Sequence, residues 1–179
     1  MRCWLTFNHA RGSACACFTW VGFLRQSPAN IVFNYGRYGK PSVDGIDFSL
    51  SHCGDWLALA VSQGRRIGID LENRVDPRDF QGVARQCFSP QELVKLAEGE
   101  DEALTFCATW VRKEAVLKAA GRGLDAMQGF CTASSKVFLA DDREMPAQWY
   151  VVGLEAPAEH QLALAVEGGP TRNRCFRLE

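Results

Sequence analysis

Ile67-Gly68-Ile69-Asp70-Leu71-Glu72 is the stretch that decides the expected fold, because it predicts a buried strand that ends in two carboxylates. Side chains alternate along a strand, so Asp70 and Glu72 point to one face while the three apolar residues point to the other. Two carboxylates a few ångströms apart repel unless a proton or a cation lies between them. With only oxygen ligands in view, a hard cation such as Mg²⁺ is the natural candidate. The alternative is a strand that leaves the core through acidic residues into a solvated turn.

The chain as a whole is typical of a soluble globular protein. Its 179 residues suffice for one ample core or two small, intimately packed lobes, and 47% are hydrophobic and 23% charged. The net charge of −1 and its weak asymmetry along the chain predict neither nucleic-acid nor membrane binding. No apolar run approaches the length of a transmembrane helix.

The eight cysteines point to a reducing compartment. They form no CxxC pair and no C…C…H…H arrangement with zinc-site spacing. Scattered singly through apolar segments, they behave as small hydrophobes, and we expect a cytoplasmic location.

The periodicity predicts an α+β chain. Residues 1–26 show no clean helical or strand period, and polar residues 8–11 interrupt any signal-peptide core. Helices are expected at 76–88, from a Ser89 N-cap with Pro90 and Glu92, and at 102–120 before two glycines. Besides 67–72, strands are expected at 31–33, 47–52, 56–62, 135–140, 148–154, 161–166 and near 175–178.

One internal echo suggests two similar lobes. Residues 57–61 read Leu-Ala-Leu-Ala-Val, and residues 162–166 repeat the same five letters. So short a match can arise by chance, but it fits two lobes that each contribute an equivalent strand, with a ligand site between them. We place the N-terminal lobe at 1–65 and the C-terminal lobe, with the metal site, at 66–179.

Three further features carry polar groups suited to a phosphate ligand. The loop at 34–41 holds Gly36, Gly39 and Lys40, and its backbone N–H groups can approach a ligand closely, although a plain turn reads the same way. Ser51-His52 ends a predicted strand at a hairpin tip. Glu114 and Lys118 lie four residues apart on one helix face, where a surface salt bridge is the simpler interpretation.

Taken in order, these blocks resemble the Sfp-type 4′-phosphopantetheinyl transferase family. The blocks are 38–41 (Tyr-Gly-Lys-Pro) with 48–54, then 67–72, then 110–124 (Trp-Val-Arg-Lys-Glu-Ala-Val-Leu-Lys-Ala-Ala-Gly-Arg-Gly-Leu). The resemblance implies transfer of the phosphopantetheine arm of coenzyme A to a serine of an acyl or peptidyl carrier protein, with release of adenosine 3′,5′-bisphosphate. It also implies a pseudo-twofold α+β fold of two small antiparallel sheets with helix packing.

The resemblance further implies a set of site residues. The Mg²⁺ ligands are expected to be Asp70, Glu72 and Glu114; the coenzyme A contacts Lys40, Pro41, Ser51, His52 and Lys118; and the catalytic groups Glu114 and Lys118. A cation held by three carboxylates can stabilise the charge that builds on the pyrophosphate, and Lys118 can neutralise or protonate the leaving group. Glu114, or a metal-bound water held by it, is the candidate base for the serine hydroxyl.

Two departures from the family pattern leave other functions open. Cys53 follows His52 where the family usually has Ser, and residues 1–26 offer only Arg2, Arg11 and Arg25 in place of an Arg-rich segment that binds the coenzyme A 3′-phosphate. We therefore expect an atypical, incomplete N-terminal lobe. The main alternative is a non-catalytic coenzyme A- or carrier-binding homologue; a metal-dependent phosphohydrolase is the second.

The carrier partner is defined only by class. It belongs to fatty-acid, polyketide or non-ribosomal peptide synthesis, and we expect it to dock on local basic residues such as Arg112, Lys113 or Arg122, which would otherwise be solvated surface charge. Two lobes in one chain favour a monomer.

Overall fold

The structure is a computed structural model in which residues 3–9, 30–36, 38–74, 77–138, 148–170 and 173–177 are described. Side chains of 3–9, 77–79 and 173–177 are outside the description. Arg2, Arg11, Arg25 and the end of the strand expected at 135–140 also lie outside the described residues.

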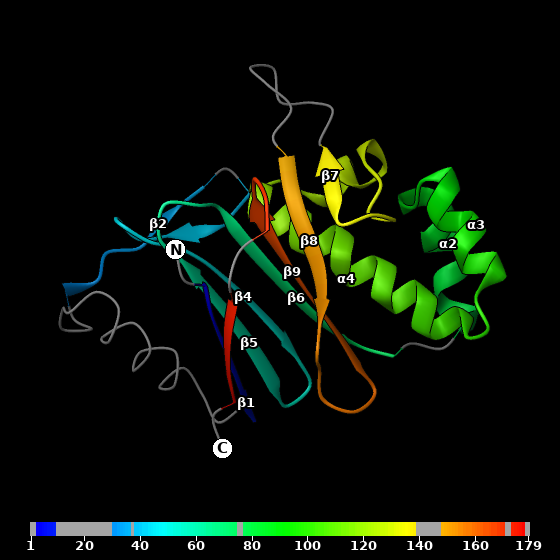
Figure 1. The fold of residues 1–179 in the computed structure, drawn as a ribbon, viewed down its shortest axis with the longest axis horizontal. Coiled ribbons are helices and arrows are strands. Elements are labelled where there is room, and N and C mark those ends of the chain that lie inside the picture. Colours follow the sequence, from blue (N-terminus) through cyan, green and yellow to red (C-terminus); the bar gives the residue numbers. More distant parts are fainter. Residues whose placement is uncertain are drawn as a thin grey trace.

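Two four-stranded sheets and a helical layer make up the fold (Figure 1). The first sheet has the order β10 (Asn173–Arg177), β1 (Cys3–His9), β5 (Trp56–Ser62), β4 (Asp47–Cys53). The second has the order β6 (Ile67–Asn73), β9 (His160–Glu167), β8 (Gln148–Leu154), β7 (Lys136–Phe138). A short pair, β2 (Asn34–Tyr35) and β3 (Pro41–Ser42), forms the third sheet. All pairings are antiparallel except that of β1 with β10. The α+β class of antiparallel sheets with helices is thereby confirmed.

Four helices of the described residues follow one another between β6 and β7. They are α2 (Pro77–Cys87), α3 (Pro90–Glu98), α4 (Glu102–Ala120) and the 3₁₀ helix η2 (Leu124–Gly129). Figure 1 shows α4 running across the second sheet, with α2 and α3 beside its N-terminal half. No helix in the described part of the chain is both long and apolar enough to cross a membrane.

The second sheet is packed on both faces, which explains the alternation in β6. Its residues Ile67, Ile69 and Leu71 are fully buried against Ala58 and Ala60 of β5. The opposite face meets α4 so closely that a methyl group on Gly68 would collide with the backbone of Ala115 and Ala119. Asp70 and Glu72 share this face with Gly68 by alternation, so the strand presents its acids toward α4.

The five-residue echo falls on inner strands of the two sheets, β5 and β9, but the two copies use different faces. In β5 the alanines face the second sheet, whereas in β9 the residues that face the first sheet are the leucines and valine at 162, 164 and 166. The alanines of β9, Ala163 and Ala165, pack in the core under α4. Small residues thus stand wherever another layer must approach closely. The pseudo-twofold relation and the boundary at residue 65 stay predictions, and β10 joins the first sheet.

Helix ends follow the expected signals. Ser89 accepts a hydrogen bond from Glu92 N, and the Glu92 side chain accepts one from Ser89 N, which forms the capping box of α3. Helix α4 ends at Gly121, whose φ of 66° is left-handed. The strand expected at 31–33 is wrong: these described residues form no strand, and the pairing with β3 begins at Asn34. Strand β1, for which residues 1–26 gave no periodic signal, exists because it fills the gap between β5 and β10.

Candidate functional site

The site begins where the two sheets meet edge to edge. Strand β4 does not pair with β6 through the backbone; instead two serines of β4 supply the acceptors. Ser49 Oγ accepts from Ile69 N at 3.1 Å, and Ser51 Oγ accepts from Leu71 N at 3.2 Å. Serines two residues apart on a strand face the same way, so this arrangement fixes β6 against β4. It also brings the Ser51 hydroxyl next to Asp70.

Asp70 is the centre of the site and is 1% exposed. Its Oδ1 accepts from Ser51 Oγ at 2.9 Å and forms an ion pair with Lys118 Nζ at 2.6 Å. Lys118 Nζ also lies 3.1 Å from Ser51 Oγ. The second carboxylate oxygen, Oδ2, is buried and has no hydrogen-bond partner among the described residues. A buried carboxylate oxygen without a partner is costly, so the site is incomplete as the protein alone supplies it.

Glu72 and Glu114 flank Asp70 from the strand and from the helix, and both are half-buried. Burial, with Asp70 as the nearest negative charge, raises the pKa of Glu72 above its ordinary value, although Lys118 opposes the shift. Burial, followed by the charges of Asp70 and Glu72, raises the pKa of Glu114 to about 7, against the effect of Lys118. One lysine therefore does not neutralise three carboxylates, and the site has net negative character.

This donor set suits a hard divalent cation. Three carboxylates supply oxygen ligands of the kind that Mg²⁺ prefers, and Asp70 Oδ2 is an oxygen in need of a positive partner. As the side chains stand, no three acidic, cysteine or histidine side chains within the described ranges are grouped to hold a metal ion. Lys118 occupies Asp70 Oδ1, and the two glutamates have rotatable stems by which to approach. Asp70, Glu72 and Glu114 are thus candidate ligands whose chemistry fits.

The residues expected to contact coenzyme A differ in their burial and in their hydrogen-bond partners. Ser51 is buried on Asp70 rather than open to solvent. His52, the next residue of β4, is exposed and lies on the opposite face of that strand. Lys40 Nζ donates to Ile67 O at 3.1 Å and to Ala119 O at 3.2 Å, and Pro41 starts the short strand β3. Lys118 pairs with Asp70, not with Glu114, so the surface salt bridge considered above does not form.

The expectation that Lys113 docks a carrier protein is wrong, because Lys113 is fully buried. Its ammonium pairs with Glu92 Oε2 at 2.9 Å and donates to Phe130 O at 2.7 Å. Glu92 Oε1 accepts from Thr132 N at 2.6 Å and from Thr132 Oγ1 at 2.8 Å. Arg112 also turns inward, with Nε donating to Thr132 O at 3.0 Å. These cations join α4 to the segment before β7.

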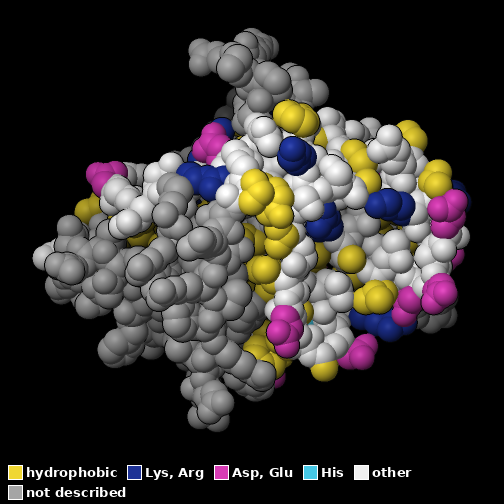
Figure 2. Space-filling model, in the orientation of Figure 1, with side chains coloured by type: hydrophobic (Ala, Val, Ile, Leu, Met, Phe, Trp, Pro, Cys, Tyr) yellow, Lys and Arg dark blue, Asp and Glu magenta, His cyan; other side chains and the backbone are white. Residues whose placement is uncertain are grey.

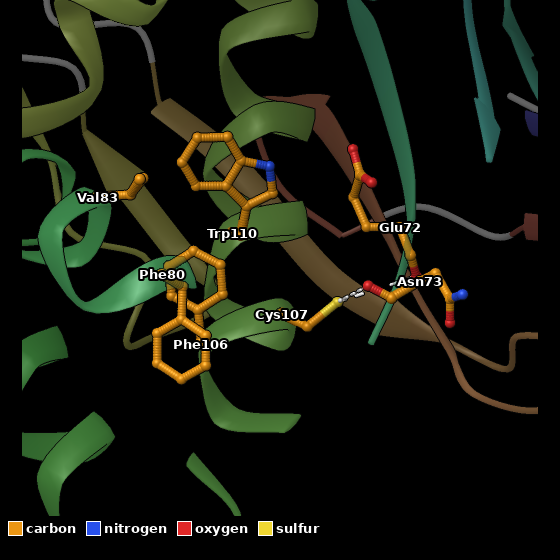
Figure 3. Close-up of a pocket in the computed structure, with 7 residues that line it drawn as sticks. All are labelled: Glu72, Asn73, Phe80, Val83, Phe106, Cys107 and Trp110. Atoms are coloured by element: carbon orange, nitrogen blue, oxygen red, sulfur yellow. Dashed lines mark hydrogen bonds between the residues drawn. The ribbon is translucent and has the colours of Figure 1, made fainter. Parts of the chain in front are cut away.

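An apolar cavity of about 240 Å³ opens beside the carboxylates (Figure 3). Figure 3 shows aromatic side chains on the helix side and Glu72 and Asn73 on the strand side, with the Cys107 thiol donating to Asn73 O at 3.4 Å. The lining residues from the helices are Phe80, Val83, Phe106, Cys107 and Trp110. The sequence analysis assigned none of these positions to a ligand cavity. The available signal was that Cys107 and Trp110 precede Glu114 by two turns and one turn of the same helix.

Comparison with known proteins identifies the family of the chain. A model of the 4′-phosphopantetheinyl transferase superfamily matches residues 66–165, which is more than half of the chain and includes β6, helices α2 to α4, η2 and most of β9. The chain belongs to this superfamily. The family resemblance found in the sequence is confirmed.

Individual relatives agree with the family match. The 4′-phosphopantetheinyl transferase HetI of Nostoc sp. (strain PCC 7120) is 32% identical over 155 residues, which cover 82% of this chain and 65% of the relative. The 4′-phosphopantetheinyl transferase of Bacillus subtilis is 36% identical over 102 residues, covering 54% of this chain and 44% of the relative. The solved structure of holo-[acyl-carrier-protein] synthase from Neisseria meningitidis gives a TM-score of 0.42 at 17% identity, covering 57% of this chain and 97% of that one. The chain spans less than two thirds of the length of both curated relatives.

Proposed function

We propose that the chain transfers the 4′-phosphopantetheine arm of coenzyme A to a serine of an acyl or peptidyl carrier protein, with Mg²⁺ and with release of adenosine 3′,5′-bisphosphate. The observation that carries this proposal is the buried Asp70, whose Oδ2 has no partner among the described residues, beside Glu72 and Glu114, whose pKa values are raised by burial and by the charge of Asp70. Such a site favours a divalent cation together with the pyrophosphate that accompanies it.

In this proposal the serine oxygen bonds to the phosphorus that carries the pantetheine arm, while the bond from that phosphorus to the bridging oxygen breaks. We assign the serine proton to Glu114, whose pKa in the metal-free protein is raised to about 7 by burial and by the charges of Asp70 and Glu72. Lys118, whose ammonium reaches Ser51 and Asp70, compensates the negative charge on the departing bisphosphate. Bound Mg²⁺ would supply further charge stabilisation at the same oxygens. Pro41, Ser51 and His52 remain proposed coenzyme A contacts, whereas the Lys40 ammonium donates to the backbone carbonyls of Ile67 and Ala119.

The apolar cavity offers room for the arm itself. Its wall at Glu72 belongs to the carboxylate site, and its remaining walls are mostly aromatic and aliphatic. A pantetheine chain that leaves the phosphate at Glu72 would pass over Cys107 toward Trp110 (Figure 3). Because the cavity is lined mainly by apolar carbon, it suits the methyl and methylene groups of that chain.

Carrier docking is proposed away from the acidic end of the molecule. Figure 2 shows acidic side chains around the end formed by α2, α3 and the turn into α4, whereas Lys and Arg side chains lie over the middle of the same face. The turn carries Glu98, Glu100, Asp101 and Glu102. An acidic carrier would be repelled there, so Arg122, beyond α4, is the better of the expected docking residues.

The direct test is mass spectrometry of an apo acyl carrier protein incubated with this chain, coenzyme A and Mg²⁺. We expect a gain equal to one phosphopantetheine arm, lost in Asp70→Ala and kept in Glu155→Ala, which removes an exposed carboxylate far from the site in sequence. Release of adenosine 3′,5′-bisphosphate without any carrier would indicate a hydrolase instead. Coenzyme A binding without release, with every carrier class tried, would indicate the non-catalytic homologue.

A further inference from the structure

Lys40 connects the two elements that carry the candidate metal ligands. Its Nζ donates to the carbonyl of Ile67, the first residue of β6, at 3.1 Å and to the carbonyl of Ala119, in the last turn of α4, at 3.2 Å. Asp47 Oδ1 lies 3.5 Å away on the more exposed side. An ammonium has three N–H donors, so these three oxygens account for its hydrogen-bonding capacity.

The helix end explains why a cation belongs there. The last four carbonyls of an α-helix lack an intrahelical donor, and they carry the negative end of the helix dipole. In α4 the backbone N–H of Gly121 reaches the carbonyls of Leu117 and Lys118, and that of Arg122 reaches Leu117. The Ala119 carbonyl takes its hydrogen bond from Lys40 instead. The lysine stem passes beside Gly121, where a Cβ would lie in van der Waals contact at 3.9 Å from Lys40 Cδ.

The contact lies on the seam between α4 and β6. Gly68 follows Ile67 directly, and it is the residue at which the helix backbone touches the strand. Lys118 precedes Ala119, and Asp70 lies on the same strand face as Gly68. Any slide of the last turn of α4 along β6 would therefore change the spacing between Lys118 and Asp70, which now stands at 2.6 Å.

We propose that Lys40 is a positioning residue whose ammonium locks the last turn of α4 to the start of β6 and so holds Glu114 and Lys118 in register with Asp70 and Glu72. The catalytic consequence rests on the function proposed above, whereas the structural lock does not. A lysine committed to two backbone carbonyls holds the site together; a lysine that served mainly as a ligand contact would have its ammonium directed at the ligand.

The test compares Lys40→Met with Lys40→Arg, Asp47→Asn and the exposed control Lys136→Met in the full chain. Three measurements need no transfer activity: hydrogen exchange of the Gly121 and Arg122 amides, Mn²⁺ binding by electron paramagnetic resonance, and binding of adenosine 3′,5′-bisphosphate by calorimetry without metal. Should Lys40→Met fail to fold, Lys40→Gln, which keeps a neutral donor, is measured in the same way.

For Lys40→Met we expect exchange of both amides to accelerate by about tenfold and Mn²⁺ binding to weaken by about tenfold, because charged hydrogen bonds to two elements are lost. Lys40→Arg, Asp47→Asn and Lys136→Met should stay within about threefold of the parent. Binding of adenosine 3′,5′-bisphosphate should change less than about twofold. Loss of nucleotide binding with unchanged exchange and Mn²⁺ affinity would overturn the proposal and make Lys40 a ligand contact. Absence of phosphopantetheine transfer in the parent would refute the proposed function. The exchange, Mn²⁺ and nucleotide measurements would still test the structural lock, because none of them needs transfer activity.

Discussion

Two neighbouring residues of α4, Lys113 and Glu114, point into two different clusters of charge. Lys113 joins Glu92 in a closed cluster, in which both carboxylate oxygens and the ammonium are hydrogen-bonded and neither side chain is exposed beyond 1%. Glu114 joins Asp70, Glu72 and Lys118 in an open cluster with an excess of carboxylates.

The pKa directions show the same contrast. Burial alone would raise the pKa of Glu92, but hydrogen bonds from Thr132, Ser89 and Lys113 outweigh it and hold that pKa below its ordinary value. In the open cluster the pKa values of both glutamates rise. A closed cluster of charge serves the fold, whereas an open one has binding capacity left for a ligand.

The largest effect is expected from Lys113→Met. It leaves the Glu92 carboxylate buried without its cation, and we expect the free energy of unfolding to fall by about 3–5 kcal/mol. Urea unfolding measures this loss. The double variant Glu92→Gln/Lys113→Met should recover part of it, since no charge then remains buried. A loss below about 1 kcal/mol in the single variant would show that the cluster is not closed.

In the open cluster, Asp70→Asn should have the opposite effect: stability should change little and transfer activity should fall strongly. Removing one carboxylate from an excess should change the free energy of unfolding by less than about 1 kcal/mol, because Lys118 is about one-third exposed and water can solvate it. The transfer rate should fall by about 10²–10³-fold, as is typical when a group that stabilises transition-state charge is lost. Urea unfolding and the carrier mass assay measure the two quantities, with Glu155→Gln as the exposed control. If Asp70→Asn strongly destabilises the fold but keeps full transfer activity, the cluster around Asp70 serves the fold and not ligand binding.

Gly68→Ala tests whether the open cluster depends on the close approach of α4 to β6. A Cβ there would collide with Ala115 O and Ala119 N and lie 3.0 Å from Ala119 Cα. We expect a loss of about 1–3 kcal/mol in unfolding free energy from the overpacked seam. Gly82→Ala is the matched control, because its Cβ meets nothing within 4 Å on the exposed helix α2, and it should stabilise by about 0.5–1 kcal/mol. Equal effects of both changes would contradict the close seam.

The smallest expected effect is on how the free energy of unfolding depends on pH: the two clusters should contribute slopes of opposite sign. Burial, followed by the charges of Asp70 and Glu72, raises the pKa of Glu114 in the folded protein from its ordinary value of 4.5 to about 7, so the metal-free folded protein binds extra protons in that window. The free energy of unfolding should therefore fall as pH rises through it, by about 1 kcal/mol for half-buried groups. Glu92, with its lowered pKa, contributes stability above pH 4.5 that is lost as pH falls.

Mg²⁺ should flatten the first slope and leave the second, because cation binding requires ionised carboxylates. Urea unfolding between about pH 3.5 and pH 7.5, in chelator and in Mg²⁺, measures both slopes, since that of Glu92 lies below its ordinary pKa. The control is Glu114→Gln, in which the metal-free slope should shrink. If neither Glu114→Gln nor Mg²⁺ changes the first slope, groups other than Glu114 cause this pH dependence of stability.

Local patterns predicted most of the elements of this fold. The capping box at Ser89, the glycine stop at Gly121 and the alternation in residues 67–72 each involve neighbours within a few positions, so the sequence states them directly. Strand β1 had no such pattern, because its place depends on partners about 50 and 170 residues away.

The candidate site divides in the same way. Asp70, Glu72, Glu114 and Lys118 were selected from spacing and family resemblance, and the structure brings them to one seam. That Ser51 would face inward onto Asp70, that Lys40 would bind backbone carbonyls and that Lys113 would be buried could not be read from spacing. Each depends on which residue of another element lies opposite.

By itself, the sequence determined the elements, the faces of β6 and α4 and the identity of the acids, because periodicity and capping act within one segment. Only the tertiary structure decided which charges are compensated. Lys113 and Glu114 are adjacent in the chain, but about 100° apart around the helix, and so they meet different partners. Whether a buried charge stabilises the fold or remains available to a ligand is set by those partners, which lie at least 17 residues away in the case of Lys113.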